Sequence, residues 1–190
     1  AVLLHAGVGV GAPQPQHAKQ QGGVAAMPAG DLATVSAYLN YDRVQPGQQA
    51  VVALVLDVQP GYHAQSSTPI DKNLIAFRLT GLSAAPGTAY EPLYPEGHLE
   101  SYPALGQMSV YTGRAITYIP VQVAVGAVAG STFTIRGKAT FQICDDQACF
   151  PPEDREWEVS IPVIAARGEL VSSANEGLYD DFDPTVWSNL

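Results

Sequence analysis

The chain has 190 residues and a net charge of −9, because 9 Lys and Arg stand against 18 Asp and Glu. A protein that binds the nucleic-acid backbone needs a basic surface, so this balance argues against a nucleic-acid partner. Charged residues make up only 14% and apolar residues 46% of the chain, which excludes a disordered acidic protein, while 18 Gly and 15 Pro favour a folded domain rich in turns.

The first 30 residues predict an arm without regular structure. Residues 1–12 are apolar and mostly small, which is typical of the remnant of a signal peptide and equally of a flexible chain end, so both interpretations stay open. Residues 13–30 are rich in Gln and Pro and follow neither a strand nor a helix period, which predicts a linker. No apolar run reaches the ~18 residues of a membrane-spanning helix, so no span is expected in this chain.

Residues 31–165 predict one all-β domain, because short apolar segments are separated by Gly, Pro and other turn residues. About seven or eight strands with no amphipathic helix between them favour an antiparallel β-sandwich of immunoglobulin-like architecture. The expected strands cover 32–42, 51–58, 74–80, 90–94, 108–111, 116–125, 132–143 and 157–163.

Three of these segments also predict which side chains face the core. Segment 51–58 is apolar at nearly every position, so both of its faces are expected to be buried. Alternation along 116–125 and 132–143 assigns one face of each strand to the core. The inward residues expected there are Thr117, Ile119, Val121, Val123, Val125, Phe133, Ile135, Ala139, Phe141 and Ile143.

The two cysteines of the chain, Cys144 and Cys149, bracket four residues just after the 132–143 strand. Continued alternation puts Cys144 on the polar face of that strand, so we expect it near the surface. Asp145 and Asp146 predict a turn, because Asp side chains hydrogen-bond to their own backbone in turns. Such a turn returns Cys149 to the side of Cys144 and allows a disulfide.

Three interpretations of this pair stay open: a structural disulfide, a redox-active pair and a metal site. A local structural disulfide is common in secreted proteins. The stability that a cross-link adds grows with the length of the loop it closes, so a disulfide across six residues adds little stability to a chain of this size. Zinc normally takes a second pair of ligands, and copper on a β-sandwich would need a nearby His and Met. No His follows Cys149, so no metal is expected.

Residues 166–190 predict an acidic tail or linker, because five acidic residues there stand against Arg167 alone. A short helix over 172–178 is one interpretation of its first half. Apolar residues within the tail are expected to dock on a neighbouring surface; these are Leu178, Tyr179, Phe182, Val186 and Trp187.

The run CDDQACFPP at 144–152 resembles the active-site hairpin of the N-terminal periplasmic domain of the DsbD family of thiol:disulfide interchange proteins. Weaker similarity at 61–63, 94–97, 102–106 and 110–113 extends the resemblance over about 35–163. It implies a redox-active disulfide between Cys144 and Cys149 that needs neither a cofactor nor a metal. It also implies a protective loop at 100–108, in which Tyr102, Pro103 and Leu105 shield the disulfide.

The resemblance further implies an activity and its partners. A thioredoxin-like protein or domain would donate electrons, and the chain would reduce disulfides of periplasmic client proteins as a thiol–disulfide oxidoreductase, within an electron-transfer system linked to cytochrome c biogenesis. Cys149 would form the link to the partner and Cys144 would resolve it. Export to the periplasm is implied, and a tether to the inner membrane in the natural protein stays open.

The remaining site residues also follow from this resemblance. His63 and Gln65 are expected to point the same way on a strand and to line the site with Phe150, and His63 could move a proton during exchange. The charges of Asp145 and Asp146 are expected to raise the pKa of the thiols. The alternative to this redox function is a non-catalytic binding or assembly module whose disulfide is structural.

Overall fold

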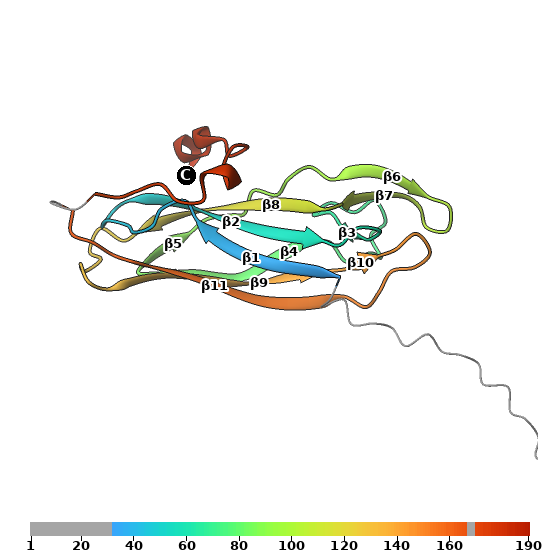
Figure 1. Ribbon diagram of the computed structural model, residues 1–190, viewed down its shortest axis with the longest axis horizontal. Coiled ribbons are helices and arrows are strands. Elements are labelled where there is room, and N and C mark those ends of the chain that lie inside the picture. The colour runs from blue at the N-terminus through green and yellow to red at the C-terminus, as the bar shows by residue number, and fades with distance from the viewer. Residues whose placement is uncertain (1–31, 167–169) are drawn as a thin grey trace, which may run out of the picture.

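The strands of the computed structural model, which describes residues 32–166 and 170–190, run along the long axis of an elongated body (Figure 1). The predictions for residues 1–30 lie outside the described residues. The strands are β1 (Ala33–Leu39), β2 (Gln49–Val58), β3 (His63–Gln65), β4 (Arg78–Ala85), β5 (Gly87–Ala89), β6 (His98–Tyr102), β7 (Gly106–Tyr111), β8 (Arg114–Val123), β9 (Thr132–Phe141), β10 (Ile143–Cys144) and β11 (Glu153–Pro162).

Two antiparallel sheets form the layers of the sandwich. One has the strand order β1-β2-β8-β5 and the other the order β11-β9-β4. A third sheet, β10-β3-β7-β6, extends one end of the body (Figure 1). The predicted immunoglobulin-like antiparallel sandwich is confirmed.

The core between the layers follows the alternation in the sequence. Every inward residue expected on the 132–143 segment is fully buried. Four of them lie on β9, the middle strand of its sheet between β11 and β4, and Ile143 lies on β10 in the third sheet. Thr117, Ile119, Val121 and Val123 of β8 are also fully buried. The prediction for Val125 was wrong: the strand ends at Val123, the chain turns at Ala124–Ala127, and Val125 is 86% exposed.

Several strand positions differ from the predictions. The apolar segment 74–77 precedes β4 instead of forming it, and β4 contains a bulge at Gly81, where φ is +62°. Segment 90–94 makes only an isolated bridge at Leu93, since Pro92 has no N–H to donate. The pattern of apolar residues predicts neither β5 nor β6: β5 has three residues, and β6 occupies the first part of the loop expected at 100–108.

The C-terminal tail packs on the outer face of the first sheet. Leu178, Tyr179, Phe182 and Trp187 cover a cluster formed by Val51, Ala53 and Tyr118. The Tyr118 hydroxyl donates a hydrogen bond to the carbonyl of Leu178 at 2.9 Å. This cover explains why segment 51–58 is apolar on both faces.

The helical content of the tail is lower than expected. Instead of a helix over 172–178, one short 3-10 turn occupies Glu176–Leu178 and a second Pro184–Asn189. Val186 is half-buried but lies outside the cluster formed by the other apolar tail residues. Within residues 32–166 and 170–190, no helix is long and apolar enough to cross a membrane.

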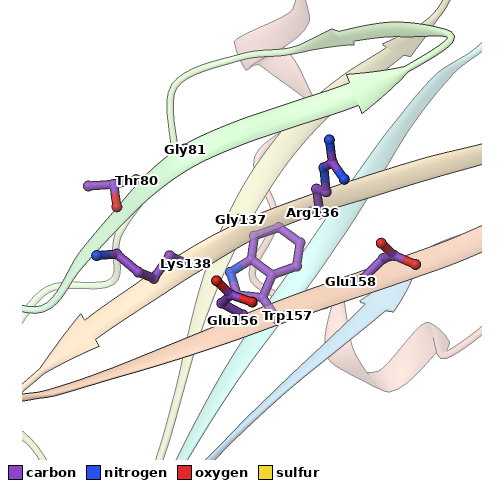
Figure 2. Close-up of a pocket in the computed structure, with 8 residues that line it drawn as sticks. All are labelled: Thr80, Gly81, Arg136, Gly137, Lys138, Glu156, Trp157 and Glu158. Carbon is purple, nitrogen blue, oxygen red and sulfur yellow. The ribbon is translucent and has the colours of Figure 1, made fainter.

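A hollow of about 590 Å³ lies on the second sheet, across β4, β9 and β11 (Figure 2). Trp157 is buried there beside Gly137. In the register of β9 and β11, Arg136 lies opposite Glu158 and Lys138 lies opposite Glu156. Gly137 has no room for a side chain, because an added Cβ would lie 2.8 Å from Cζ2 of Trp157. Neither cysteine lines this hollow.

Candidate redox site

Cys144 and Cys149 form a disulfide in a hairpin at one end of the sandwich, next to β3 (Figure 1). Their Cα atoms are 3.9 Å apart. Backbone hydrogen bonds close the same hairpin without the sulfurs: Asp145 N–H donates to the carbonyl of Ala148 at 3.0 Å, and Phe150 N–H donates to the carbonyl of Ile143 at 2.8 Å. The disulfide therefore spans a turn that the backbone already holds.

The prediction that Cys144 lies near the surface was wrong, since its side chain is fully buried. The ladder of β9 ends at Phe141, and Gln142 interrupts the strand. Ile143 and Cys144 then pair with Ala64 and His63 of β3, so they belong to a different sheet and are buried together. Alternation predicts a face only within one continuous ladder, and here the ladder changes at Gln142.

A small apolar cluster covers the disulfide. Met108, Val110 and Cys144 are buried at its centre, and partly buried side chains surround them. Two of the three expected shielding residues, Tyr102 and Leu105, belong to this cluster, whereas Pro103 is exposed in the turn between β6 and β7. The partly buried members are Leu74, Tyr102, Leu105 and Cys149.

The sequence reasoning missed three members of this cover, Leu74, Met108 and Val110. Met108 and Val110 lie on β7, and the pairing of β7 with β3 and β6 brings them to the disulfide, whereas Leu74 lies in the connection between β3 and β4. The two cysteines are exposed to different extents. Cys149 is half-buried at the edge of the cover, while Cys144 lies beneath it.

Gln65 lies directly against the disulfide. Its side chain is fully buried, and its amide Nε2 donates to Sγ of Cys144 at 3.3 Å and lies 3.9 Å from Sγ of Cys149. The backbone fixes the position of Gln65, because its N–H donates to the carbonyl of Gln142 at 3.0 Å and it pairs with Val110 of β7. Gln65 is thus the polar side chain that the described structure brings to both sulfurs.

His63 lies on β3 opposite Cys144 and stacks on Tyr102, with ring centroids 4.1 Å apart and planes 13° apart. Burial lowers the pKa of His63, and the negative charges of Glu100, Asp146 and Asp145 oppose this shift. The imidazole is therefore more easily kept neutral than an exposed one. A hollow of about 400 Å³ beside the ring is lined by His63, Glu100, Tyr102 and Asp146, among others.

Tyr102 is the aromatic member of the cover and is held from two sides. It stacks on His63, and its hydroxyl donates to a carboxylate oxygen of Glu100 at 2.6 Å. Burial raises the pKa of Tyr102, and the hydrogen bond to Glu100 raises it further. The phenol therefore stays protonated and keeps donating to Glu100.

The two aspartates of the hairpin differ in their environment. Oδ1 of Asp145 accepts hydrogen bonds from the N–H groups of Gln147 and Ala148, both at 2.8 Å, which confirms the predicted turn. These bonds lower the pKa of Asp145 because they stabilise the carboxylate. Asp146 is exposed. The effect of either charge on the thiols stays a prediction.

Phe150, which was expected to line the site, is not part of the apolar cluster over the disulfide. Its ring contacts Tyr62, with ring centroids 6.2 Å apart, and it packs against the main core rather than the cluster over the disulfide. Phe150 thus anchors the base of the hairpin. In the described ranges, no group of three or more His, Cys, Asp or Glu side chains could hold a metal ion.

Replacing Tyr102 by Ala is expected to speed reduction of the disulfide by dithiothreitol severalfold. The variant removes the ring that covers His63 and the cluster around Cys144, and the rate of thiol attack depends on access to the sulfur. The rate is measured by quenching with an alkylating reagent and weighing the products. Tyr90→Ala is the control, because Tyr90 contacts Trp187 and Gln122, far from the cover. Equal rates in both variants would show that Tyr102 does not limit access.

Comparisons with known proteins found one matching family and several similar solved structures. A family model described as "Thiol:disulfide interchange protein DsbD, N-terminal" matches residues 31–161. The structure is similar to the reduced N-terminal domain of DsbD from Neisseria meningitidis, with 17% identity and a TM-score of 0.42 over 78% of this chain and 95% of that one. It is also similar to the N-terminal periplasmic domain of ScsB from Proteus mirabilis, with 13% identity and a TM-score of 0.46 over 72% of this chain.

The chain spans 48% of the solved ScsB chain, and no curated protein matches it. The family model, in contrast, covers well over half of the present sequence and includes the whole hairpin from Cys144 to Cys149. The chain therefore belongs to the family of the N-terminal domain of the thiol:disulfide interchange protein DsbD, whose general activity is thiol–disulfide exchange.

Proposed function

We propose that this chain is a periplasmic thiol–disulfide exchange domain that takes electrons from a thioredoxin-like partner and reduces disulfides of client proteins through Cys144 and Cys149. The observation that carries the proposal is the disulfide itself, which lies beneath a small cover in a hairpin already closed by the backbone. A bond that is shielded from solvent and not needed to hold the turn suits reversible chemistry.

A purely structural role explains this disulfide poorly. In the chain-entropy account, closing a loop of 15 residues adds about 3 kcal/mol of stability, and a shorter loop adds less. The sequence separation here is 5. The sandwich core buries large side chains from both layers without contribution from the sulfurs. Reduction is therefore expected to leave the fold intact.

The proposed cycle begins with attack on the half-buried Cys149. A thiolate of the donor attacks Sγ of Cys149, the new mixed disulfide forms, and Cys144 leaves as a thiolate. The donor's second thiolate then attacks the donor's first sulfur in the mixed disulfide. This forms the donor's disulfide and releases the Cys149 thiolate, so two electrons have passed to this chain. The reduced pair repeats these steps in the opposite direction on a client disulfide, with Cys149 attacking and Cys144 resolving.

The same proposal covers location and requirements. Membership in the DsbD family and likeness to a domain described as periplasmic support a periplasmic location. The chemistry needs the disulfide and no further cofactor. Client proteins in this proposal include those of cytochrome c biogenesis, and His63, next to Cys144, is positioned to accept or return a proton.

The reduction potential of the Cys144–Cys149 pair tests the proposal. The pair is equilibrated with thiol buffers, trapped with an alkylating reagent and weighed, and the fold is followed by circular dichroism. A potential of roughly −180 to −270 mV with the fold intact after reduction supports an electron-passing domain. A potential well below about −300 mV, or unfolding on reduction, contradicts it and supports a binding or assembly module with a structural disulfide.

A further inference from the structure

The two sulfurs of the disulfide have unequal surroundings. Nε2 of Gln65 is 3.3 Å from Sγ of Cys144 and 3.9 Å from Sγ of Cys149, so the hydrogen bond to Cys144 is the stronger one. Cys144 is fully buried and Cys149 is half-buried. The buried sulfur therefore has a donor beside it, and the other sulfur faces an incoming partner.

Attack on a disulfide splits it unequally. The attacked sulfur keeps a covalent bond and the other sulfur leaves with the electron pair, so a group that stabilises the leaving thiolate directs the attack to its neighbour. A thiolate buried in apolar surroundings is unfavourable unless a donor contacts it. At Cys144 the apolar surroundings are Met108 and Val110, and the donor contacting its sulfur is Gln65.

We infer that Gln65 is the hydrogen-bond donor that stabilises Cys144 as the leaving and resolving thiolate, and that it thereby directs an incoming thiolate to Cys149. This inference rests on the proposed exchange function and assigns a residue to its bond-breaking step. The partner sulfur bonds to Cys149, the bond between Cys149 and Cys144 breaks, and the electron pair stays on Sγ of Cys144. This thiolate accepts a hydrogen bond from the amide N–H of Gln65.

The carboxamide of Gln65 also fits the protonated state of Cys144. Oε1 of Gln65 is buried and has no hydrogen-bond partner among the described residues. Rotation of the carboxamide by half a turn exchanges Nε2 and Oε1, so the same side chain donates to a thiolate and accepts from a thiol. A buried oxygen without a hydrogen bond destabilises the oxidised protein. In the reduced protein the same oxygen can accept a hydrogen bond from the Cys144 thiol, which accounts for its presence.

The test uses the full chain with Cys149→Ser, which leaves Cys144 as its single thiol. The thiolate of Cys144 is followed against pH by its ultraviolet absorbance, with and without Gln65→Met, a change that keeps the length of the side chain and removes the donor. We expect the fraction of thiolate at neutral pH to fall about tenfold or more, because a hydrogen bond to a charged group is lost. An unchanged titration curve would overturn the inference.

Other titratable groups face Cys144 and are retained in both proteins. They are His63, which pairs with Cys144 on β3, Tyr102 in the cover, Glu100 beside both His63 and Tyr102, and Asp145 and Asp146 in the turn after the cysteine. Gln142→Met is the matched control. Gln142 also holds this hairpin, since its Nε2 donates to the carbonyl of Phe150 at 3.1 Å, but the hydrogen bonds of its side chain go to backbone groups and not to the sulfurs. It is expected to leave the titration unchanged.

A second variant and a second measurement separate the possible failures. Gln65→Asn keeps a polar side chain but moves the amide away from the sulfur by one methylene group. This variant is used if the Gln65→Met protein does not fold, and it is expected to show the same loss of thiolate. Reduction of the intact disulfide by dithiothreitol should slow by a similar factor in either variant. If wild-type protein shows no exchange with a thioredoxin-like donor, the proposed function fails while the titration still decides the role of Gln65.

Discussion

Replacing Cys144 by Ser is expected to trap a mixed disulfide through Cys149, whereas replacing Cys149 by Ser is expected to abolish mixed disulfide formation. Cys149 lies half-buried at the edge of the cover and Cys144 is fully buried beneath Tyr102 and Leu105. A thiolate at Cys149 can therefore reach a disulfide on another protein, and without Cys144 nothing in this chain releases it. Each variant is mixed with a thioredoxin-like protein that keeps only one of its two cysteines, carried as a mixed disulfide with a small aromatic thiol, so that no second thiol of the partner can reverse the trap. The products are quenched with acid and weighed under non-reducing conditions.

Both variants should remain folded, which separates chemistry from stability. The hairpin keeps its backbone hydrogen bonds at Asp145 and Phe150, so the loss of unfolding free energy is expected to stay below about 3 kcal/mol. Urea unfolding of each variant measures this value. Equal rates of mixed disulfide formation by the two variants would contradict the order of attack, and no mixed disulfide with either would count against exchange altogether.

Adding one methyl group at Gly137 is expected to cost the fold about 2 kcal/mol. A Cβ at this position would lie 2.7 Å from Cδ2 of Leu82 and 2.8 Å from Cζ2 of Trp157. Leu82 can change its rotamer, but Trp157 is a rigid ring that is 7% exposed and packed in the main core, so the backbone of β9 or the ring must shift. Overpacking of this kind typically costs about 1–3 kcal/mol. The free energy of unfolding of Gly137→Ala in urea measures it.

Gly126→Ala is the matched control for this change. An added Cβ at Gly126 meets nothing within 4 Å, so the same substitution should leave stability unchanged or raise it slightly through a less flexible unfolded chain. A Gly137→Ala protein as stable as Gly126→Ala would mean that the core beside Trp157 is looser than the structure indicates. Since the hollow beside Trp157 is separate from the disulfide, exchange activity should persist in whatever fraction remains folded.

The strands that the sequence predicts best are those that form continuous ladders. Along β9, the alternating residues Phe133, Ile135, Ala139 and Phe141 predict the buried face, and all four are fully buried. The apolar character of 51–58 on both faces likewise predicts two covers, which prove to be the opposing sheet and the C-terminal tail. In both cases burial of one strand face selects the residue types directly, so the pattern can be read without the partner strands.

The same reasoning fails where the contacts depend on pairing between distant segments. Cys144 was expected near the surface, because alternation carries no signal for the change of sheet at Gln142. Met108 reaches the disulfide only through the third sheet, whose shortest strands have two and three residues, and Leu74 reaches it from the connection between β3 and β4. A strand that short offers at most one repeat of the alternation, which is too little to distinguish it from a loop.

The place of the disulfide at one end of an elongated sandwich limits how much surface a partner can bury (Figure 1). A partner that reaches Cys149 end-on meets the hairpin at 144–149 and the β6–β7 turn, while the broad faces of both main sheets point elsewhere. Contacts below about 1,200 Å² of total buried surface are typical of transient electron-transfer encounters. A complex of this size dissociates quickly, so the shape of the domain favours a short-lived complex with each partner and rapid transfer from one partner to the next.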